Sequence, residues 1–245
     1  MYNITRSGDT FIYSVILTCI MTTYKPRMAE EEIQKRKVWQ EEVYNKLVSI
    51  REKREVSVLG KEFIVLPGMF APIFEDSRIF AKAILGEVKP TDSVLDLGTG
   101  TGVQGIFAAQ KAAKVLSVDI NPKALECAKL NVNKHNLSNI EVRQSNLFSN
   151  VSEKFDLILF NPPYRWFKPR DMLERGELDE NYETLNRFFS QTKQFLKKNG
   201  RILLVFSSSG DLKYVESLIQ KYNFNSTIVK QSESDNWLYM VYKLF

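Results

Sequence analysis

From residue 75 onward, short apolar runs alternate with longer segments in which apolar residues recur every three or four positions. Apolar runs predict buried strands, and the recurring spacing predicts amphipathic helices. The predicted helices cover residues 77–85, 103–113, 122–134, 182–196 and 212–222. The predicted strands cover residues 93–97, 115–118, 140–143, 157–160, 202–206, 226–230 and 237–242. Because helices separate most strands, the pattern predicts an α/β fold with a mainly parallel sheet covered on both faces. The last two strands, which no helix separates, predict an antiparallel edge.

The first 67 residues follow a different pattern. Residues 29–54 predict an amphipathic helix that packs on the main domain. Four apolar residues share one face of this helix: Trp39, Val43, Leu47 and Ile50. Residues 56–66 consist of two short strand-like runs around Gly60-Lys61, a pattern typical of a β-hairpin. We therefore expect an N-terminal extension over residues 1–67 and a main domain over residues 68–245.

The longest apolar run covers residues 11–21. It is shorter than the roughly 20 residues that a bilayer-spanning helix needs, so we expect no membrane attachment. It also lacks the basic start and the small-residue cleavage site of a secretory signal peptide. Two interpretations stay open. The run is an additional strand or helix on the main body, or it precedes a true start at Met28, after which acidic residues open a helix.

Composition excludes several classes of protein. With 245 residues, 44% hydrophobic and 26% charged, the chain has the make-up of an ordinary globular protein rather than collagen, a disordered polymer or a disulfide scaffold. Its two cysteines, Cys19 and Cys127, and its single histidine, His135, provide no zinc cluster. We therefore expect no metal and a reducing, cytoplasmic location. The net charge of +5 permits contact with nucleic acid or acidic protein without requiring either.

A glycine-rich turn follows the strand predicted at residues 93–97. Gly98, Gly100 and Gly102 let a ligand approach the backbone closely, and a dinucleotide-binding turn has similar spacing. Asp96, within the strand end, argues against a dinucleotide because its carboxylate would repel a pyrophosphate. A negative charge here favours a ligand with ammonium and sulfonium groups, and S-adenosylmethionine (SAM) carries both. These residues therefore indicate SAM as the cofactor.

Two further polar residues stand at the ends of the next strands. Asp119 follows the strand at residues 115–118, where a carboxylate can accept hydrogen bonds from ribose hydroxyls; an ordinary helix cap is the alternative. Asn146 follows the strand at residues 140–143 and can contact the amine of an adenine; a plain turn residue is the alternative. We expect both side chains at the cofactor site.

The strand at residues 157–160 runs directly into Asn161, Pro162, Pro163 and Tyr164. The two prolines fix the backbone and remove two N–H donors. What remains is an array of acceptors, the Asn161 side-chain oxygen and nearby carbonyls, beside an aromatic ring. Such a site suits a planar NH₂ group, because the acceptors hold both hydrogens and the ring packs on the flat face. We expect Asn161, Pro162 and Tyr164 to be the catalytic residues, with Asn161 also adjoining the cofactor.

Residues 75–245 resemble class I SAM-dependent methyltransferases of the amino-methylating type. The motifs that carry the resemblance are DLGTGTG at 96–102, VDINPKAL at 118–125, SNLF at 145–148 and FNPPY at 160–164. The resemblance implies a Rossmann-like seven-stranded sheet whose last strand is inserted antiparallel. It also implies that Asp119 binds the SAM ribose and that Asn161 with Pro162 holds the target amine. The family often has Asp where Asn146 stands, which weakens the assignment of Asn146.

Within this class the chain is most similar to HemK-type methyltransferases, which modify a glutamine amide of a protein. The shared features are the hairpin and the segment at 68–77, with Pro72, Glu75 and Asp76; the N-terminal helix has no counterpart in the family pattern. The NPPY motif also occurs in enzymes acting on adenine N6 or guanine N2. It therefore indicates that the acceptor is a planar nitrogen, but not which kind of molecule carries that nitrogen. The favoured acceptor is a glutamine-bearing loop of a protein of release-factor type. Structured RNA (rRNA or tRNA) is the alternative, and a small-molecule amine is third.

The segment after Tyr164 interleaves three cations with two aromatic residues, in the order Arg165, Trp166, Phe167, Lys168 and Arg170. Such a segment can follow phosphates and stack on bases, can hold an acidic protein loop, or can be a lid that packs on the domain. A non-catalytic SAM-fold scaffold and a nicotinamide dehydrogenase are the competing classes. The complete NPPY motif argues against the first, and Asp96 argues against the second.

Overall fold

The computed structural model describes residues 24–245. The apolar run at residues 11–21 and Cys19 therefore lie outside the described residues, and both interpretations of that run stay predictions. Within residues 24–245, no helix combines the length and the apolar character needed to cross a membrane.

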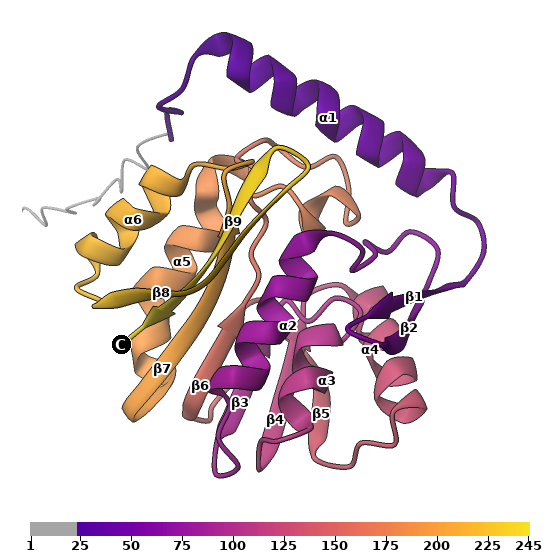
Figure 1. Cartoon of the computed structure of the whole chain (residues 1–245), viewed down its shortest axis with the longest axis vertical. Coiled ribbons are helices and arrows are strands. Elements are labelled where there is room, and N and C mark those ends of the chain that lie inside the picture. Colours follow the sequence, from indigo (N-terminus) through magenta and orange to yellow (C-terminus); the bar gives the residue numbers. More distant parts are fainter. Residues whose placement is uncertain (1–23) are drawn as a thin grey trace, which may run out of the picture.

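A seven-stranded sheet forms the centre of the molecule, in the order β5-β4-β3-β6-β7-β9-β8 (Figure 1). Its strands are β3 (Ser93–Leu97), β4 (Lys114–Asp119), β5 (Ile140–Gln144), β6 (Phe155–Phe160), β7 (Leu196–Ser207), β8 (Ser226–Ser234) and β9 (Trp237–Leu244). Strands β3 to β7 are mutually parallel, whereas β9 is inserted antiparallel between β7 and β8. The predicted Rossmann-like fold is confirmed, including the antiparallel position of the last strand.

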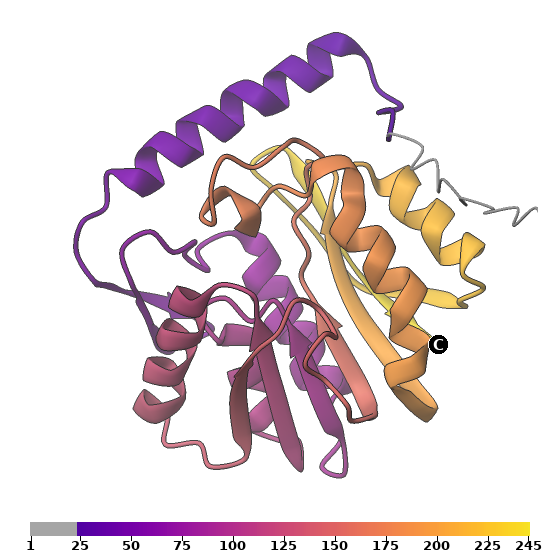
Figure 2. The ribbon, with the colours of Figure 1, turned by 180° about the vertical axis from the view of Figure 1, so that it is seen from behind.

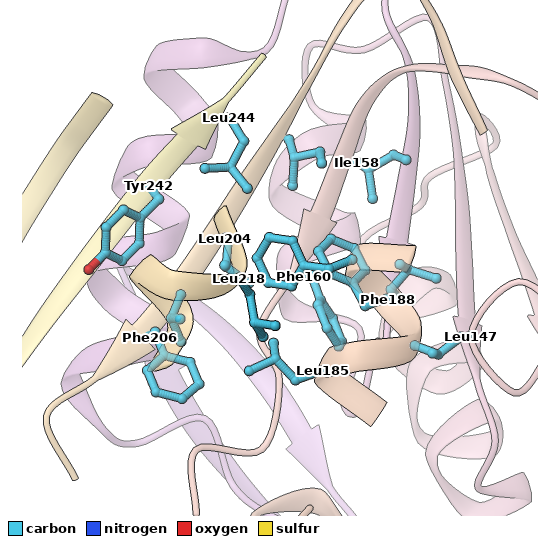
Figure 3. Close-up of a cluster of buried hydrophobic side chains, with 14 of the residues drawn as sticks. Leu147, Ile158, Phe160, Leu185, Phe188, Leu204, Phe206, Leu218, Tyr242 and Leu244 are labelled. Carbon is cyan, nitrogen blue, oxygen red and sulfur yellow. The ribbon is translucent and has the colours of Figure 1, made fainter. Parts of the chain in front are cut away.

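Helices cover both faces of the central part of the sheet, which is why the central strands β3 and β6 are buried along nearly their whole length. The helices are α2 (Glu75–Glu87), α3 (Val103–Ala109), α4 (Pro122–Lys134), α5 (Glu183–Gln191) and α6 (Leu212–Lys221). Alternate residues of β7 point into two separate cores: Leu203 packs with residues of α2 and α3, and Leu204 packs with residues of α5 and α6. Figure 3 shows the second core, where Leu204 meets Leu185 and Leu218.

Two predicted helices are shorter than expected. The helix predicted at 103–113 ends at Ala109, where the side-chain amide of Asn139 donates to the carbonyl oxygens of Ala109 and Ala112 and replaces the missing helical bonds. The helix predicted at 182–196 continues only as a 3₁₀ turn, Thr192–Phe195, because Leu196 already pairs with Phe155 in the sheet.

The N-terminal part consists of α1 (Glu30–Val48) and a hairpin of β1 (Arg54–Val58) and β2 (Lys61–Val65). The hairpin is confirmed; its turn residues are Leu59 and Gly60, both with positive φ, one position earlier than predicted. The hairpin is anchored to α4 by Asn131, whose side chain exchanges two hydrogen bonds with the backbone of Ile64. The boundary between an extension and a main domain at residue 67 stays a prediction.

Helix α1 lies across the end of the molecule at which the parallel strands finish (Figures 1 and 2). The predicted helix is confirmed, although it stops six residues earlier than expected because β1 begins at Arg54. Its packing face is more polar than the sequence predicts, since Arg36 and Gln40 are buried alongside Leu47. Arg36 donates to the carbonyl oxygens of Ser208 and Ser209, so α1 is attached through polar anchors to the loop that follows β7.

Candidate active site

The glycine turn after β3 has the backbone that the sequence predicts. Gly98, Gly100 and Gly102 all have positive φ, a conformation that L-residues with side chains rarely adopt. Gly102 serves packing as well, because a Cβ at this position would lie 3.2 Å from the Cα of Ala128 on α4. The glycines therefore shape the turn, and Gly102 also allows α4 to approach it closely.

Asp96 is buried beneath this turn. Its Oδ2 accepts hydrogen bonds from the Thr99 hydroxyl at 2.5 Å, the Gly105 N–H at 3.0 Å and the Ser117 hydroxyl at 3.2 Å. Burial raises the pKa of Asp96 to about 6, and these hydrogen bonds oppose the shift. One carboxylate oxygen of Asp96 thus fixes the turn, while the residue still lines the cavity in front of it.

A cavity of about 200 Å³ opens at the ends of β3, β4 and β6. The structure brings six of the predicted site residues together in its wall: Asp96, Gly98, Gly100, Asp119, Asn146 and Asn161. We call it the cofactor cavity. Gly102, Pro162 and Tyr164 are not among its lining residues.

Asp119 connects the end of β4 to the glycine turn. Its two carboxylate oxygens accept hydrogen bonds from the N–H groups of Gly100 and Asn121, each at 2.9 Å. Burial raises the pKa of Asp119, and the backbone hydrogen bonds oppose the shift. Because an ionised carboxylate has about four acceptor positions, two positions are left for hydroxyl groups of a ligand.

Asn146 has a partner that sequence reasoning missed. Its side-chain oxygen accepts a hydrogen bond from Arg187 Nη1 at 3.2 Å, across 41 residues of sequence. The oxygen that was expected to bind an adenine amine is therefore partly engaged already, and no local sequence signal indicated the contact.

Asn161 is held from two sides. Its Nδ2 donates to Asp76 Oδ2 at 3.1 Å, and its Oδ1 accepts from the Tyr164 hydroxyl at 2.6 Å. That hydroxyl also lies 3.2 Å from Asp76 Oδ2, so the three side chains form one network. Asp76 is buried, which raises its pKa, and its other oxygen accepts from the Ser77 N–H. Sequence reasoning included Asp76 in the HemK-like segment but gave it no role.

A second cavity, of about 70 Å³, adjoins the first. The two share five lining residues: Phe70, Asp76, Asn161, Pro163 and Gly176. Its wall also includes the predicted residues Pro162 and Tyr164. The rest of the wall is rich in aromatic side chains that the sequence did not indicate as site residues: Trp39, Phe70, Phe74, Trp237 and Tyr239. We call it the acceptor cavity, and Trp39 makes α1 part of its wall.

Of the three interleaved cations after Tyr164, Arg165 is buried, whereas Lys168 and Arg170 are exposed. Arg165 is only 3% exposed, stacks on Trp39 at 4.3 Å and lies 3.5 Å from the carboxylate of Glu177. Arg170 pairs with Glu41 and Glu174. For Arg165 the structure favours the alternative, a segment that packs on the domain. Lys168 and Arg170 are exposed, so for them all three interpretations stay predictions.

Groupings of acidic, cysteine and histidine side chains able to hold a metal ion are absent from residues 24–245. Of the described residues that line the cofactor cavity, three are carboxylates, Asp76, Asp96 and Asp119, and one is a cation, Arg175. This balance fits a ligand with positively charged groups, as SAM has, better than a pyrophosphate.

The sequence and the fold are similar to those of known methyltransferases. A model of the family described as methyltransferase small domain matches residues 61–239. A protein provisionally named protein N5-glutamine methyltransferase, from Methanocaldococcus jannaschii, is 37% identical over 62% of this chain and 79% of its own length. The release factor glutamine methyltransferase of Buchnera aphidicola is 34% identical over 61% of this chain and 58% of its own length.

RNA-modifying enzymes are similar as well. Ribosomal RNA small subunit methyltransferase C of Haemophilus influenzae is 32% identical over 64% of this chain and 44% of its own length. A solved 16S rRNA N2 methyltransferase of T. thermophilus, in complex with AdoMet and guanosine, superposes with a TM-score of 0.59 over 79% of this chain and 50% of that chain. At 22% identity the last comparison shows a shared fold. The chain spans about half the length of both RNA-modifying enzymes.

Proposed function

Because the chain belongs to the methyltransferase small domain family and is a SAM-dependent methyltransferase, we propose that it methylates the side-chain amide nitrogen of a glutamine in a protein substrate. The observation that carries the proposal is the position of Asn161, held by Asp76 and Tyr164 where the cofactor and acceptor cavities meet. The Asn161 side chain thus lies in the wall that the two cavities share.

The cofactor cavity has a donor and acceptor set that fits SAM. Asp119 would accept hydrogen bonds from the ribose hydroxyls with the positions that its backbone contacts leave open. Asp96 and Asp76 place negative charge along the same wall, where the sulfonium and ammonium groups would lie. When bound, SAM supplies an electrophilic methyl group on a positively charged sulfur.

Asn161 and Pro162 would then act on the acceptor nitrogen. An amide nitrogen is a poor nucleophile because its lone pair is delocalised into the carbonyl group. If Asn161 Oδ1 and the Pro162 carbonyl oxygen accept its two N–H groups, the nitrogen is oriented and pyramidal geometry is favoured. Positioning of this kind supplies on the order of 7–11 kcal/mol in ideal cases. The methylated nitrogen is acidic and loses its proton to water, so the step requires no histidine or cysteine base.

Two observations support a protein acceptor. The relative named for N5-glutamine methylation is 37% identical, and the match extends over 79% of its length, more than for the RNA-modifying relatives above. In addition, Arg165 is buried beside Glu177 rather than exposed at the surface, which removes one of the three cations expected to follow a nucleic-acid backbone.

Guanine N2 in RNA is the second candidate. The aromatic wall of the acceptor cavity favours it, since Trp39, Phe74 and Trp237 offer flat faces on which a base can stack. Adenine N6, which presents a similar amine, belongs to the same alternative.

Radiolabelled methyl transfer into cell lysate tests the proposal. Wild-type protein should label material that protease destroys and ribonuclease leaves intact, and mass spectrometry should place the methyl group on glutamine. The Asn161→Ala variant should lower labelling by about 10²-fold or more, as for loss of one preorganised polar group. Asn225→Ala, a change at an exposed asparagine far from both cavities, is the matched control. Labelling that ribonuclease removes would instead support the RNA candidate.

A further inference from the structure

The acceptor cavity contains a buried ion pair that the chemistry at Asn161 does not use. Arg165 and Glu177 both line the cavity and are 3% and 6% exposed. Within residues 24–245 the Arg165 side chain makes a single hydrogen bond, from Nε to Gln40 Oε1 at 3.3 Å. Neither carboxylate oxygen of Glu177 accepts a hydrogen bond from the described part of the chain, although Arg165 Nη2 lies 3.5 Å away.

This pair has unused hydrogen-bonding capacity. A guanidinium carries five N–H donors and an ionised carboxylate about four acceptor positions, far more than the contacts observed here. A buried ion pair is costly unless hydrogen bonds satisfy both partners, because each group has given up its hydration. Burial raises the pKa of Glu177 to about 7, while the charge of Arg165 and the nearby Gln40 amide oppose the shift. Unsatisfied groups in the wall of a cavity are candidates for ligand contacts.

Backbone hydrogen bonds hold the segment around Arg165 and Glu177. The backbone of Arg165 donates to the Glu177 carbonyl oxygen at 3.4 Å and accepts from the Asp179 N–H at 2.8 Å. The Tyr182 hydroxyl donates to the Tyr164 carbonyl oxygen at 2.8 Å, which fixes the adjoining residue. Backbone hydrogen bonds thus hold the segment in place, and the side chains of Arg165 and Glu177 are left for another purpose.

The chemistry of the acceptor indicates that purpose. A glutamine amide presents one NH₂ group and one carbonyl oxygen, and the NH₂ group would be taken by Asn161 and Pro162. Its carbonyl oxygen would then be removed from bulk water, where an acceptor without a donor is costly. Arg165 directly follows Tyr164 and lines the same cavity. It can only donate, whereas ionised Glu177 can only accept.

We propose that Arg165 and Glu177 are the specificity-determining residues for an amide acceptor, an inference that rests on the proposed function. Arg165 donates to the side-chain carbonyl oxygen of the acceptor glutamine, and Glu177 accepts a hydrogen bond from a main-chain N–H of the same peptide segment. Helix α1 positions the pair, because Trp39 stacks on the Arg165 guanidinium and Gln40 binds its Nε. Acceptor recognition therefore includes an element outside the segment that matches the family.

The test uses the full-length protein, labelled SAM and a blocked glutamine, N-acetyl-L-glutamine methylamide, with guanosine as the competing probe. Arg165→Lys keeps the charge but not the planar fork of donors, and Glu177→Gln keeps the shape but not the charge. We expect each variant to raise the KM for the blocked glutamine by about tenfold to a hundredfold, as for one charge-assisted hydrogen bond. The affinity for SAM, measured by calorimetry, should stay at the wild-type value. Arg170→Lys makes the same replacement at an arginine that does not line the acceptor cavity, and it should leave KM unchanged.

The outcomes separate the two proposals. If wild-type protein methylates the blocked glutamine and both variants keep the wild-type KM, the ion pair has no role and only this inference fails. If wild-type protein leaves the blocked glutamine unlabelled, whether or not guanosine is labelled, the proposed function fails and the inference with it. If Arg165→Lys unfolds and therefore loses its SAM affinity, the KM of Glu177→Gln for the blocked glutamine decides whether the ion pair has a role.

Discussion

Asp76 should act on the reaction through Asn161, and Asp76→Ala tests this. In the wild-type protein Asp76 Oδ2 accepts from Asn161 Nδ2 at 3.1 Å and lies 3.2 Å from the Tyr164 hydroxyl, whose single proton is donated over the shorter distance to Asn161 Oδ1. Removing the carboxylate leaves the Asn161 amide with one remaining anchor, the Tyr164 hydroxyl on Oδ1. The amide can then rotate and turn its donor toward the acceptor nitrogen, which also presents donors.

The expected magnitude follows from the type of hydrogen bond removed. A hydrogen bond to a charged group contributes about 1.5–3 kcal/mol, so kcat should fall by about 10- to 150-fold in Asp76→Ala. Tyr164→Phe removes a neutral bond worth about 0.5–1.5 kcal/mol and should lower kcat by only about 2- to 12-fold. The carboxylate of Asp76 accepts from the Ser77 N–H with one oxygen and from Asn161 Nδ2 with the other. Asp76→Asn keeps only one side-chain oxygen for these two donors, so its kcat should lie between those of Asp76→Ala and Tyr164→Phe.

Turnover of the blocked glutamine at saturating SAM measures these effects, because saturation removes any contribution from weakened cofactor binding. Thermal melting of each variant checks that the fold is retained. A kcat for Asp76→Ala within threefold of wild type would refute the reasoning. An effect of Tyr164→Phe as large as that of Asp76→Ala would show that the hydroxyl, and not the carboxylate, orients Asn161.

Three further predictions concern the cofactor side of the site. Asp119→Ala should weaken SAM binding by about tenfold or more in calorimetry, since a carboxylate with open acceptor positions is lost; unchanged affinity would remove Asp119 from the ribose site. Gly102→Ala should lower the free energy of unfolding by about 1–3 kcal/mol in urea titrations, because φ is +86° and Ala128 lies 3.2 Å from the new Cβ. Gly86→Ala, in α2 with open space around it, should not destabilise the fold. Burial raises the pKa of Asp96 from 3.8 to about 6, so the folded state binds the Asp96 proton more tightly than the unfolded state does. The stabilisation that this proton provides is complete below about pH 4 and is lost as the pH rises to about 6. Wild-type protein should lose stability across that range relative to Asp96→Asn, and parallel urea midpoints in the two proteins would contradict this.

The sheet and the cofactor turn were predictable because their signals are local. Strand β3 is buried along its whole length, and three of its five residues, Val94, Leu95 and Leu97, are apolar. The helix cap at Asn121 and the positive φ values of Gly98 and Gly100 depend on neighbouring residues only, and the sequence shows both. Asn161 was predictable for the same reason, since two adjacent prolines after a strand are unusual in themselves.

The contacts between distant segments were not predictable from pattern. Asp76 and Asn161 are 85 residues apart, and an acidic residue in the first turn of a helix also has an ordinary explanation as a favourable charge at the helix N-terminus. Arg165 is charged and stands in a loop, which suggests solvent exposure, yet it is buried because Glu177 and Trp39 come from other parts of the chain. Burial of a charged residue depends on a partner that its local sequence does not contain.

The division of the site between two parts of the chain affects how acceptor specificity can be inferred from relatives. The family match covers residues 61–239, which include the glycine turn, Asp119 and Asn161. Helix α1 lies outside that match, yet Trp39 forms part of the acceptor wall and Gln40 contacts Arg165. Cofactor binding is therefore expected to be common to proteins that share the matched segment. The choice of acceptor is expected to depend on α1 and on the residues that it positions, so substitution of Trp39 or Gln40 should change the use of the acceptor before it changes SAM affinity.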